Sequence, residues 1–151
     1  MQHYRYGLSD EAQEEITLIQ QVSIFTENKK GAMRALTGLL SKSGINIHSF
    51  VTNDSAEFGI VRMIVSDTEK AIMLLRENGY QTKCTSVLMI AVSDEPGSLD
   101  DLLRRIEMAN VNIDYLYTAF DRINPGPLII VHSEDMHELE SYLKSSGFRC
   151  I

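Results

Sequence analysis

The pattern of apolar and polar residues in the first half of the chain predicts a succession of strands and helices. Apolar residues such as Val22 and Ile24 alternate with polar ones over 18–26, as in a half-buried strand. Apolar residues then recur at three- and four-residue spacing, which predicts a helix with one apolar stripe: Met33, Leu36, Leu39 and Leu40. The elements predicted to follow are strands at 45–53 and 57–66 joined by a turn at 54–56, a helix at 68–78 that ends at Gly79, and a short final strand.

The second half of the chain repeats this succession. Its predicted elements are a strand at 87–92, a helix with the apolar stripe Leu99, Leu102, Leu103 and Ile106, strands at 111–119 and 128–133 around Asn124-Pro125-Gly126, a helix at 134–146 that ends at Gly147, and a short final strand. An offset of 66 residues relates Gly31 to Gly97 and Asn46 to Asn112. We therefore predict two tandem copies, at 18–84 and 85–151, after an N-terminal tail at 1–17.

The order of elements in each copy predicts the fold. A βαββαβ order with right-handed crossovers gives a four-stranded antiparallel sheet with both helices on one face, so we predict an α+β fold of two ferredoxin-like modules. Phe50, Val61 and Leu116 suggest that apolar residues occur on both sides of several strands. We expect the helix-free face or an edge to be covered by the other copy or by another chain, because a module of this size has a marginal core alone.

Composition and charge exclude several classes of partner. The chain has 151 residues and a formal net charge of -7, and its 14 basic residues are scattered singly or in pairs. Binding to nucleic acid or to an anionic membrane requires clustered Lys and Arg, so we expect neither. Apolar runs are far shorter than the roughly 20 residues of a membrane helix, and the first ten residues lack a signal pattern, so we expect a cytoplasmic protein.

The residues that most often perform chemistry do not form a recognisable active or metal site. Cys84 and Cys150 are neither adjacent nor in a CxxC motif, which predicts two reduced thiols. The four histidines show no HxH or HxxxH spacing, so we expect neither a metal nor another cofactor. We predict that the chain is not an enzyme. An acylphosphatase-like enzyme of this fold is the alternative, for which Lys29 and Arg34 would have to bind the phosphate.

The loop between the first strand and the first helix of each copy has the composition of a ligand site. Gly31 and Gly97 let the backbone turn closely, and the N–H groups at the start of the next helix suit a carboxylate. An ammonium group would need acceptors, and these could come from the loop and from the next strand: Asn28, Asp94, Asn46 and Asn112. The same side chains could instead cap the helix or satisfy the backbone, so both roles stay open.

These motifs resemble the ACT domain, a small regulatory module that binds amino acids in many metabolic enzymes. The loop reads Glu27-Asn28-Lys29-Lys30-Gly31 in the first copy and Asp94-Glu95-Pro96-Gly97 in the second. The segment after each helix reads Gly44-Ile45-Asn46-Ile47 and Asn110-Val111-Asn112-Ile113. The resemblance covers both copies, so the whole chain is similar to a free-standing tandem ACT protein.

The resemblance implies where an effector would bind. In ACT domains of the serine-regulated phosphoglycerate dehydrogenase kind, the loop asparagine and the asparagine before the second strand hold the effector. Lys30 stands where the family usually has proline, and Thr26 where the dehydrogenase type has histidine, so the resemblance does not imply which amino acid binds. The two sites need not be equal. The candidate ligand-binding residues are Asn28, Lys30, Gly31, Ala32, Asn46 and Ile47 in the first copy and Asp94, Pro96, Gly97, Ser98, Asn112 and Ile113 in the second.

The resemblance also implies a function and partners. ACT domains usually pair and place effectors between modules, and two copies in one chain could form that pair. We therefore predict an amino-acid-binding regulatory or sensor protein with a free amino acid as effector, a homodimer, and a metabolic enzyme as a possible partner. The alternative is a regulatory docking subunit of a metabolic enzyme, as small regulatory subunits of acetolactate synthase are, with little or no ligand binding of its own.

Overall fold

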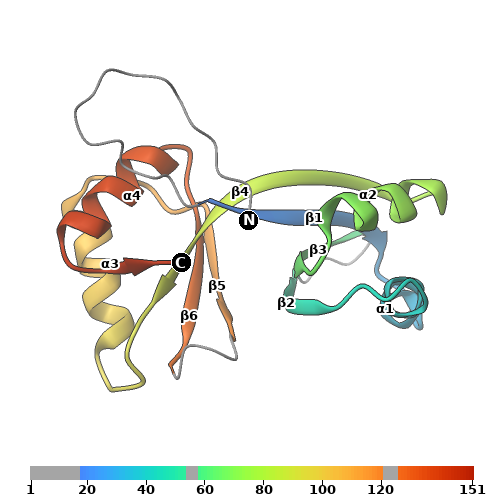
Figure 1. Cartoon of the computed structure of the whole chain (residues 1–151), viewed down its shortest axis with the longest axis horizontal. Helices are drawn as coiled ribbons and strands as arrows, with labels where there is room; N and C mark the ends of the chain where they lie inside the picture. Colours follow the sequence, from blue (N-terminus) through green and yellow to red (C-terminus); the bar gives the residue numbers. More distant parts are fainter. Residues whose placement is uncertain (1–17, 54–57, 121–125) are drawn as a thin grey trace. The chain divides into compact units, whose positions relative to one another are not determined.

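The computed structural model describes residues 18–53, 58–120 and 126–151. The turn at 54–56, the tail at 1–17 and Asn124-Pro125 lie outside this part of the chain. The described residues form seven strands and four helices (Figure 1): β1 (Ile19–Glu27), α1 (Ala32–Lys42), β2 (Ile47–Thr52), β3 (Phe58–Val65), α2 (Thr68–Glu77), β4 (Gln81–Ala91), α3 (Ser98–Met108), β5 (Tyr115–Ala119), β6 (Leu128–His132), α4 (Met136–Ser145) and β7 (Arg149–Cys150).

The chain divides into two compact units, which we call the first module, Gln20–Ser86, and the second module, which contains Val87–Ile151. In the first module the strands lie in the order β2-β3-β1-β4, and β3 is antiparallel to both of its neighbours. In the second module the order is β5-β6-β4-β7, with every pair antiparallel. Each module therefore has the βαββαβ connectivity of a ferredoxin-like fold, which confirms the predicted fold class.

One strand serves both modules. The sequence pattern predicts a short strand after Gly79 and a separate one at 87–92, but β4 runs without a break over Gln81–Ala91. Its first part is the last strand of the first module, and its second part is the first strand of the second. The predicted boundary between the copies, after residue 84, falls inside this strand.

Both helices of the first module cover the same face of its sheet. Val22 and Ile24 of β1 alternate with polar residues and are fully buried, as are Leu36 and Leu40 of α1 and Leu75 of α2. These side chains belong to one core cluster, completed by Ile45, Val61, Met63, Val65 and Ala71. The apolar stripe of each helix therefore packs on one side of the strands, as predicted.

The second module has a core of the same construction. Leu102 and Ile106 of α3 and Leu139 and Leu143 of α4 are buried against one face of the strands. The strand residues in this cluster are Leu88, Ile90, Ile129 and Val131, and Val111 contributes from the segment before β5. Figure 1 shows α3 and α4 on one side of the sheet, and the two helices contact each other.

Two of the three residues that suggested apolar positions on both faces of the strands lie on the helix-covered face. Val61 and Leu116 both pack with the helix-covered cores, and Phe50 is 59% exposed. The helix-free face of β1 carries the polar side chains of Gln21 and Ser23, which alternate with the core residues of that strand. Strand alternation places Val61 and Leu116 on the helix side. Other residues nevertheless confirm apolar positions on both faces of a strand, since Leu128 and Ile130 of β6 are fully buried and alternate with the core residues Ile129 and Val131.

Candidate functional site

The two predicted ligand loops have the same backbone turn. Gly31 is the residue that precedes α1, with φ 84°, and Gly97 precedes α3, with φ 91°. An L-residue with a side chain rarely adopts this left-handed conformation, so glycine is required in both loops. The capping position of each helix is thus a glycine, and neither Asn28 nor Asp94 occupies it.

The loop residues of both modules lie largely on the surface. Asn28, Lys30 and Gly31 are exposed in the first module, and Ala32 is half-buried at the start of α1. In the second module Asp94, Pro96 and Gly97 are exposed, whereas Ser98 is half-buried and its Oγ lies 2.6 Å from Oγ of Ser93. A ligand that touches these loops would meet accessible polar groups.

Asn46 presents its side chain at the start of β2. Its backbone N–H donates to Oγ of Ser66 at 2.9 Å, and its carbonyl accepts from the N–H of Ser66 at 2.9 Å. The backbone of Asn46 is therefore satisfied by one partner residue. The side-chain amide is exposed and forms no hydrogen bond with the described residues. This amide is available to a ligand, and the neighbouring Ile47 packs against the core.

Asn112 does not occupy the equivalent place in the second module. The predicted strand at 111–119 begins only at Tyr115, so Asn112 lies three residues before it. Val111 is in the core and Ile113 packs against it, which leads the chain through an irregular segment instead of a strand. The residue whose N–H pairs with the neighbouring strand is Asp114, which donates to the carbonyl of His132 at 3.0 Å. The two modules therefore differ in the register with which this segment pairs with the neighbouring strand, and the first module has a bulge between Ile47 and Ser49.

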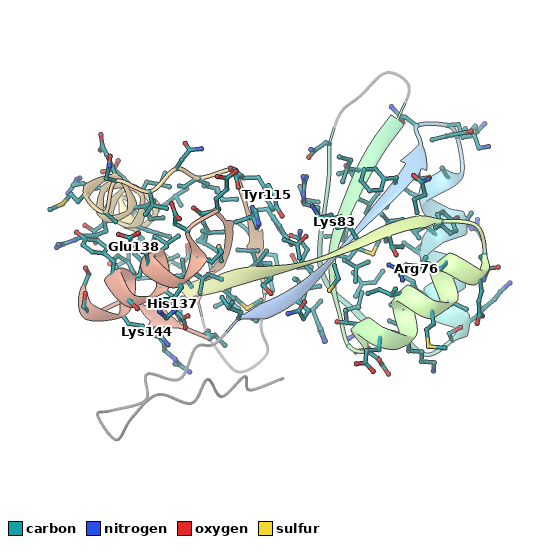
Figure 2. All side chains as sticks on the ribbon, turned by 90° about the horizontal axis from the view of Figure 1, so that it is seen from above. Arg76, Lys83, Tyr115, His137, Glu138 and Lys144 are labelled. Carbon is teal, nitrogen blue, oxygen red and sulfur yellow. The ribbon has the colours of Figure 1, made fainter. Side chains whose placement is uncertain are left out.

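Asp114 is part of a small cluster in the second module. Its carboxylate Oδ2 lies 2.8 Å from Nδ1 of His132, and the His132 ring stacks on Tyr115 with centroids 5.0 Å apart (Tyr115 is labelled in Figure 2). Asp114 and His132 are both partly exposed. In the first module the 66-residue offset places His48 and Ser66 at these positions, so the cluster occurs in one copy only.

An open cavity with both polar and apolar walls adjoins Asn46 in the first module. It has a volume of about 590 Å³ and lies between one face of α1 and the residues that lead into β2. This volume lies within the ~300–1,000 Å³ of typical small-molecule sites, and the cavity is open to solvent on one side. The lining residues are Arg34, Thr37, Gly38, Ser41, Gly44, Ile45, Asn46 and Ile47.

The second module has a smaller cavity in a different place. It has a volume of about 320 Å³ and lies beside the loop before α3. Its lining residues are Ala91, Val92, Ser93, Pro96, Gly97, Ser98, Asp101 and Phe148. Neither of these two cavities brings the loop residue, Asn28 or Asp94, together with the asparagine near the next strand.

The sequence reasoning did not identify the α1 residues of the larger cavity as ligand-binding. Arg34, Thr37, Gly38 and Ser41 follow each other at helical spacing, so they lie on one face of α1. The sequence alone gives Arg34 a role only in the acylphosphatase alternative. The sequence does contain a signal for this face, because small and polar residues, including a glycine inside the helix, recur along one side of α1.

The cysteines and the described acidic and histidine side chains add no second site. Both cysteines are free thiols. Burial raises the pKa of the Cys150 thiol to about 11, and burial also raises that of Cys84. Across 18–53, 58–120 and 126–151, no three His, Cys, Asp or Glu side chains are grouped to hold a metal ion. No helix in these ranges is long and apolar enough to cross a membrane.

Comparison with known proteins places the chain in a family. A family model described as an ACT domain pair matches residues 17–141. Protein BT0572 from Bacteroides thetaiotaomicron is 31% identical with a TM-score of 0.82, and the match covers 89% of this chain and 92% of that one.

More distant structures share the fold. The regulatory subunit of aspartate kinase from Thermus thermophilus, in a ligand-free form, is 13% identical with a TM-score of 0.63 and coverage of 86% and 92%. The same subunit from Thermus flavus is 12% identical with a TM-score of 0.60 and coverage of 86% and 94%. No match was found among curated proteins. The predicted resemblance is thereby confirmed, and the chain belongs to the ACT domain family as a tandem pair of ACT domains.

Proposed function

We propose that this chain is a regulatory protein that binds a free amino acid through its ACT modules. The observation that carries the proposal is the open cavity of the first module, which is lined by Asn46, whose side-chain amide forms no hydrogen bond with the described residues. The family supports the same function, because ACT domains are regulatory modules, and two similar structures are regulatory subunits of aspartate kinase. In this proposal the chain senses a metabolite and performs no catalysis itself.

The groups around the cavity suit a zwitterion. The Asn46 side-chain carbonyl and the hydroxyls of Thr37 and Ser41 are acceptors for an ammonium group. Charge-assisted hydrogen bonds contribute about 1.5–3 kcal/mol each. A few of them reach the 4 to 8 kcal/mol that correspond to a Kd between about 1 mM and 1 μM, before ordering costs are subtracted.

A second copy of the chain would complete the site. The loop residues Asn28 and Gly31 do not line the cavity that contains Asn46, so one module offers only part of the predicted set. The strand β2 is the outer strand of the first module, and an outer strand can pair with another chain. We therefore propose a homodimer in which the loop of one copy approaches the β2 side of the other, with the effector between them.

A thermal-shift screen tests the proposal. The chain lacks tryptophan, so the purified full chain is heated with an external dye in the presence of each standard amino acid at millimolar concentration. A ligand at about 100 times its Kd stabilises by ~2.7 kcal/mol, which raises the melting midpoint of a chain this size by several degrees. Asn46→Ala should remove the shift, whereas Asn53→Ala, at the end of β2, serves as a matched control.

If a preparation shown by mass spectrometry to be free of bound ligand responds to no amino acid, the chain is not an amino-acid sensor. A shift that persists unchanged in Asn46→Ala would keep the function but contradict the site.

A docking subunit of a metabolic enzyme is the second function to test, because exposed aromatic residues favour a protein partner. Phe50 on β2 is 59% exposed and Phe25 on β1 is 42% exposed. If the chain co-purifies with one larger enzyme at fixed stoichiometry, and Phe50→Ser abolishes that association while no amino acid raises the melting midpoint, this second function is supported.

A further inference from the structure

The helix faces beside the ligand positions differ between the two modules, although the helices occupy equivalent places. On α1 the face that lines the cavity consists of Arg34, Thr37, Gly38 and Ser41. The offset of 66 residues places Asp100, Leu103, Arg104 and Glu107 at the same positions of α3. The first face is small and basic, and the second is bulky and mostly charged.

The difference in size is greatest at Gly38. A Cβ atom built on Gly38 would meet nothing within 4 Å, so the space beside this residue is open. Arg104 takes this position in α3, and its guanidinium lies 2.7 Å from the Asp100 carboxylate and 3.9 Å from that of Asp101. The cavity of the second module does not extend to Leu103, Arg104 or Glu107. An arginine side chain thus occupies in α3 the position at which α1 has open space.

The difference in charge concerns Arg34. The helix α1 contains Arg34 and Lys42 and no acidic residue, whereas α3 carries Asp100 and Asp101 in its first turn. Arg34 is exposed, and its guanidinium forms no ion pair with any residue in the described part of the chain. A guanidinium has five donors in a planar fork that matches a carboxylate, so it favours such a ligand in the adjacent cavity.

The residue before the second strand also differs between the two modules, and again only the first module leaves it available to a ligand. Asn46 offers an unpaired amide at the start of β2. The residue with the corresponding pairing in the second module is Asp114, whose carboxylate is already bonded to His132. Both sides of the groove are therefore suited to an amino acid only in the first module.

We propose that each chain has one ligand site of this kind, in the first module, where Arg34 binds the carboxylate of the ligand and Asn46 faces its ammonium group. The second module has no equivalent site. The inference rests on the proposed function only in assuming that the ligand also carries an ammonium group. The carboxylate-binding role of Arg34 follows from the cavity itself and applies to any small carboxylate.

The test is an NMR titration of the ¹⁵N-labelled full chain with acetate and, separately, with glycine. Acetate carries only the carboxylate, and glycine carries the carboxylate and the ammonium group. We expect saturable shifts of backbone amides at 37–41 and 44–47 with both probes, tighter with glycine, and no saturable shifts at 103–107 and 110–113. Arg34→Gln should weaken both probes tenfold or more.

Two pairs of variants separate the site from general effects of charge or folding. Arg104→Gln removes the same charge from the equivalent helix and should leave the affinity unchanged. Gly38→Arg introduces the residue of the second module and should abolish binding, whereas Gly38→Ala should retain it. The spectrum of each variant shows directly whether the protein is folded.

Each outcome decides one of the two proposals. Saturable shifts at 103–107, unchanged affinity in Arg34→Gln, or no response to either probe would overturn the inference. If acetate saturates the α1 groove but no standard amino acid stabilises the chain, the inference holds and the proposed sensor function fails. If an amino acid stabilises the chain and its affinity is insensitive to Arg34→Gln, the function holds and the inference fails.

Discussion

The carboxylate of Asp114 lies 2.8 Å from Nδ1 of His132. An ionised carboxylate only accepts hydrogen bonds, so Nδ1 of His132 is the donor and carries the proton. The bond joins the segment before β5 to the end of β6, at the point where the backbones of the same two residues also pair. The bond therefore holds the segment before β5 in place. In the first module the corresponding backbone pairing is made by Asn46, whose side chain is exposed.

We predict that Asp114→Ala destabilises the chain by about 0.5–1.5 kcal/mol. Both partners are partly exposed, so solvent weakens the pair relative to a buried one. Urea denaturation followed by circular dichroism measures this difference. The variant should bind acetate in the first module as tightly as the unmodified chain, and weakened binding would contradict the separation of the two roles.

Replacement of Gly38 by alanine should stabilise the chain by about 0.5–1 kcal/mol. The position is inside α1, its Cβ would contact nothing within 4 Å, and alanine is the better helix former by about that amount. Gly31→Ala is the contrasting control. Gly31 has φ 84°, and a side chain there costs about 1–2 kcal/mol. Equal midpoints of urea unfolding for the two variants would disprove this prediction.

Gly126→Ala should destabilise the second module for a different reason. A Cβ on Gly126 would lie 2.8 Å from the carbonyl oxygen of Val92, next to the hydrogen bond that Val92 donates to Pro127 at 3.1 Å. Because the obstacle is backbone, we expect a loss of about 1–3 kcal/mol. Gly59→Ala is the control, since its Cβ would sit 3.8 Å from the carbonyl oxygen of Thr26, an ordinary contact. A midpoint of thermal unfolding that falls equally in both variants would argue against the steric cause.

The Cys150 thiol should react slowly at neutral pH. Burial raises its pKa to about 11, with the Glu140 carboxylate acting in the same direction and Lys144, labelled on α4 in Figure 2, opposing it. Thiolate is the reactive form, so alkylation by iodoacetamide should accelerate as the pH rises toward 11. Mass spectrometry of partially alkylated protein distinguishes Cys150 from Cys84, and equal modification of the two at pH 7 would contradict the effect of burial.

The same pKa predicts how stability changes in alkali. A thiol whose pKa is raised on folding from its ordinary value of 9.0 to about 11 holds its proton more tightly in the folded state. This contribution is fully present below pH 9 and is lost as the pH rises through 11, so the free energy of unfolding should fall over that interval. Cys150→Ser should lose this part of the alkaline decrease, as measured by urea unfolding at pH 8 and pH 10.

The order of helices and strands was predictable because the spacing of apolar residues within each segment is typical of either a helix or a strand. The stripe of α1 and the alternation around Val22 correctly predicted a helix and a strand, and the repeat then predicted the second module. The continuity of β4 also had a local signal, since Gln81–Ala91 contains neither glycine nor proline to end a strand.

The register before β5 had no such signal. The motif around Asn112 matches that around Asn46 in sequence, yet the bulge in β2 and the pairing of Asp114 with His132 depend on neighbouring strands. The role of Arg34 was likewise hidden, because a helix face becomes part of a cavity only through the segment that packs beside it. Local patterns thus predicted the elements, whereas the candidate site depended on contacts between them.

The shared strand β4 restricts which insertions and deletions the gene can tolerate between the two repeats. Side chains in a strand alternate between faces, so removal of one residue between Cys84 and Leu88 would reverse the face on which the preceding residues of β4 lie relative to Leu88 and Ile90. Removal of two residues would preserve their orientation. A flexible linker would accept either change, but here we expect the spacing between repeats to vary among relatives only in steps of two.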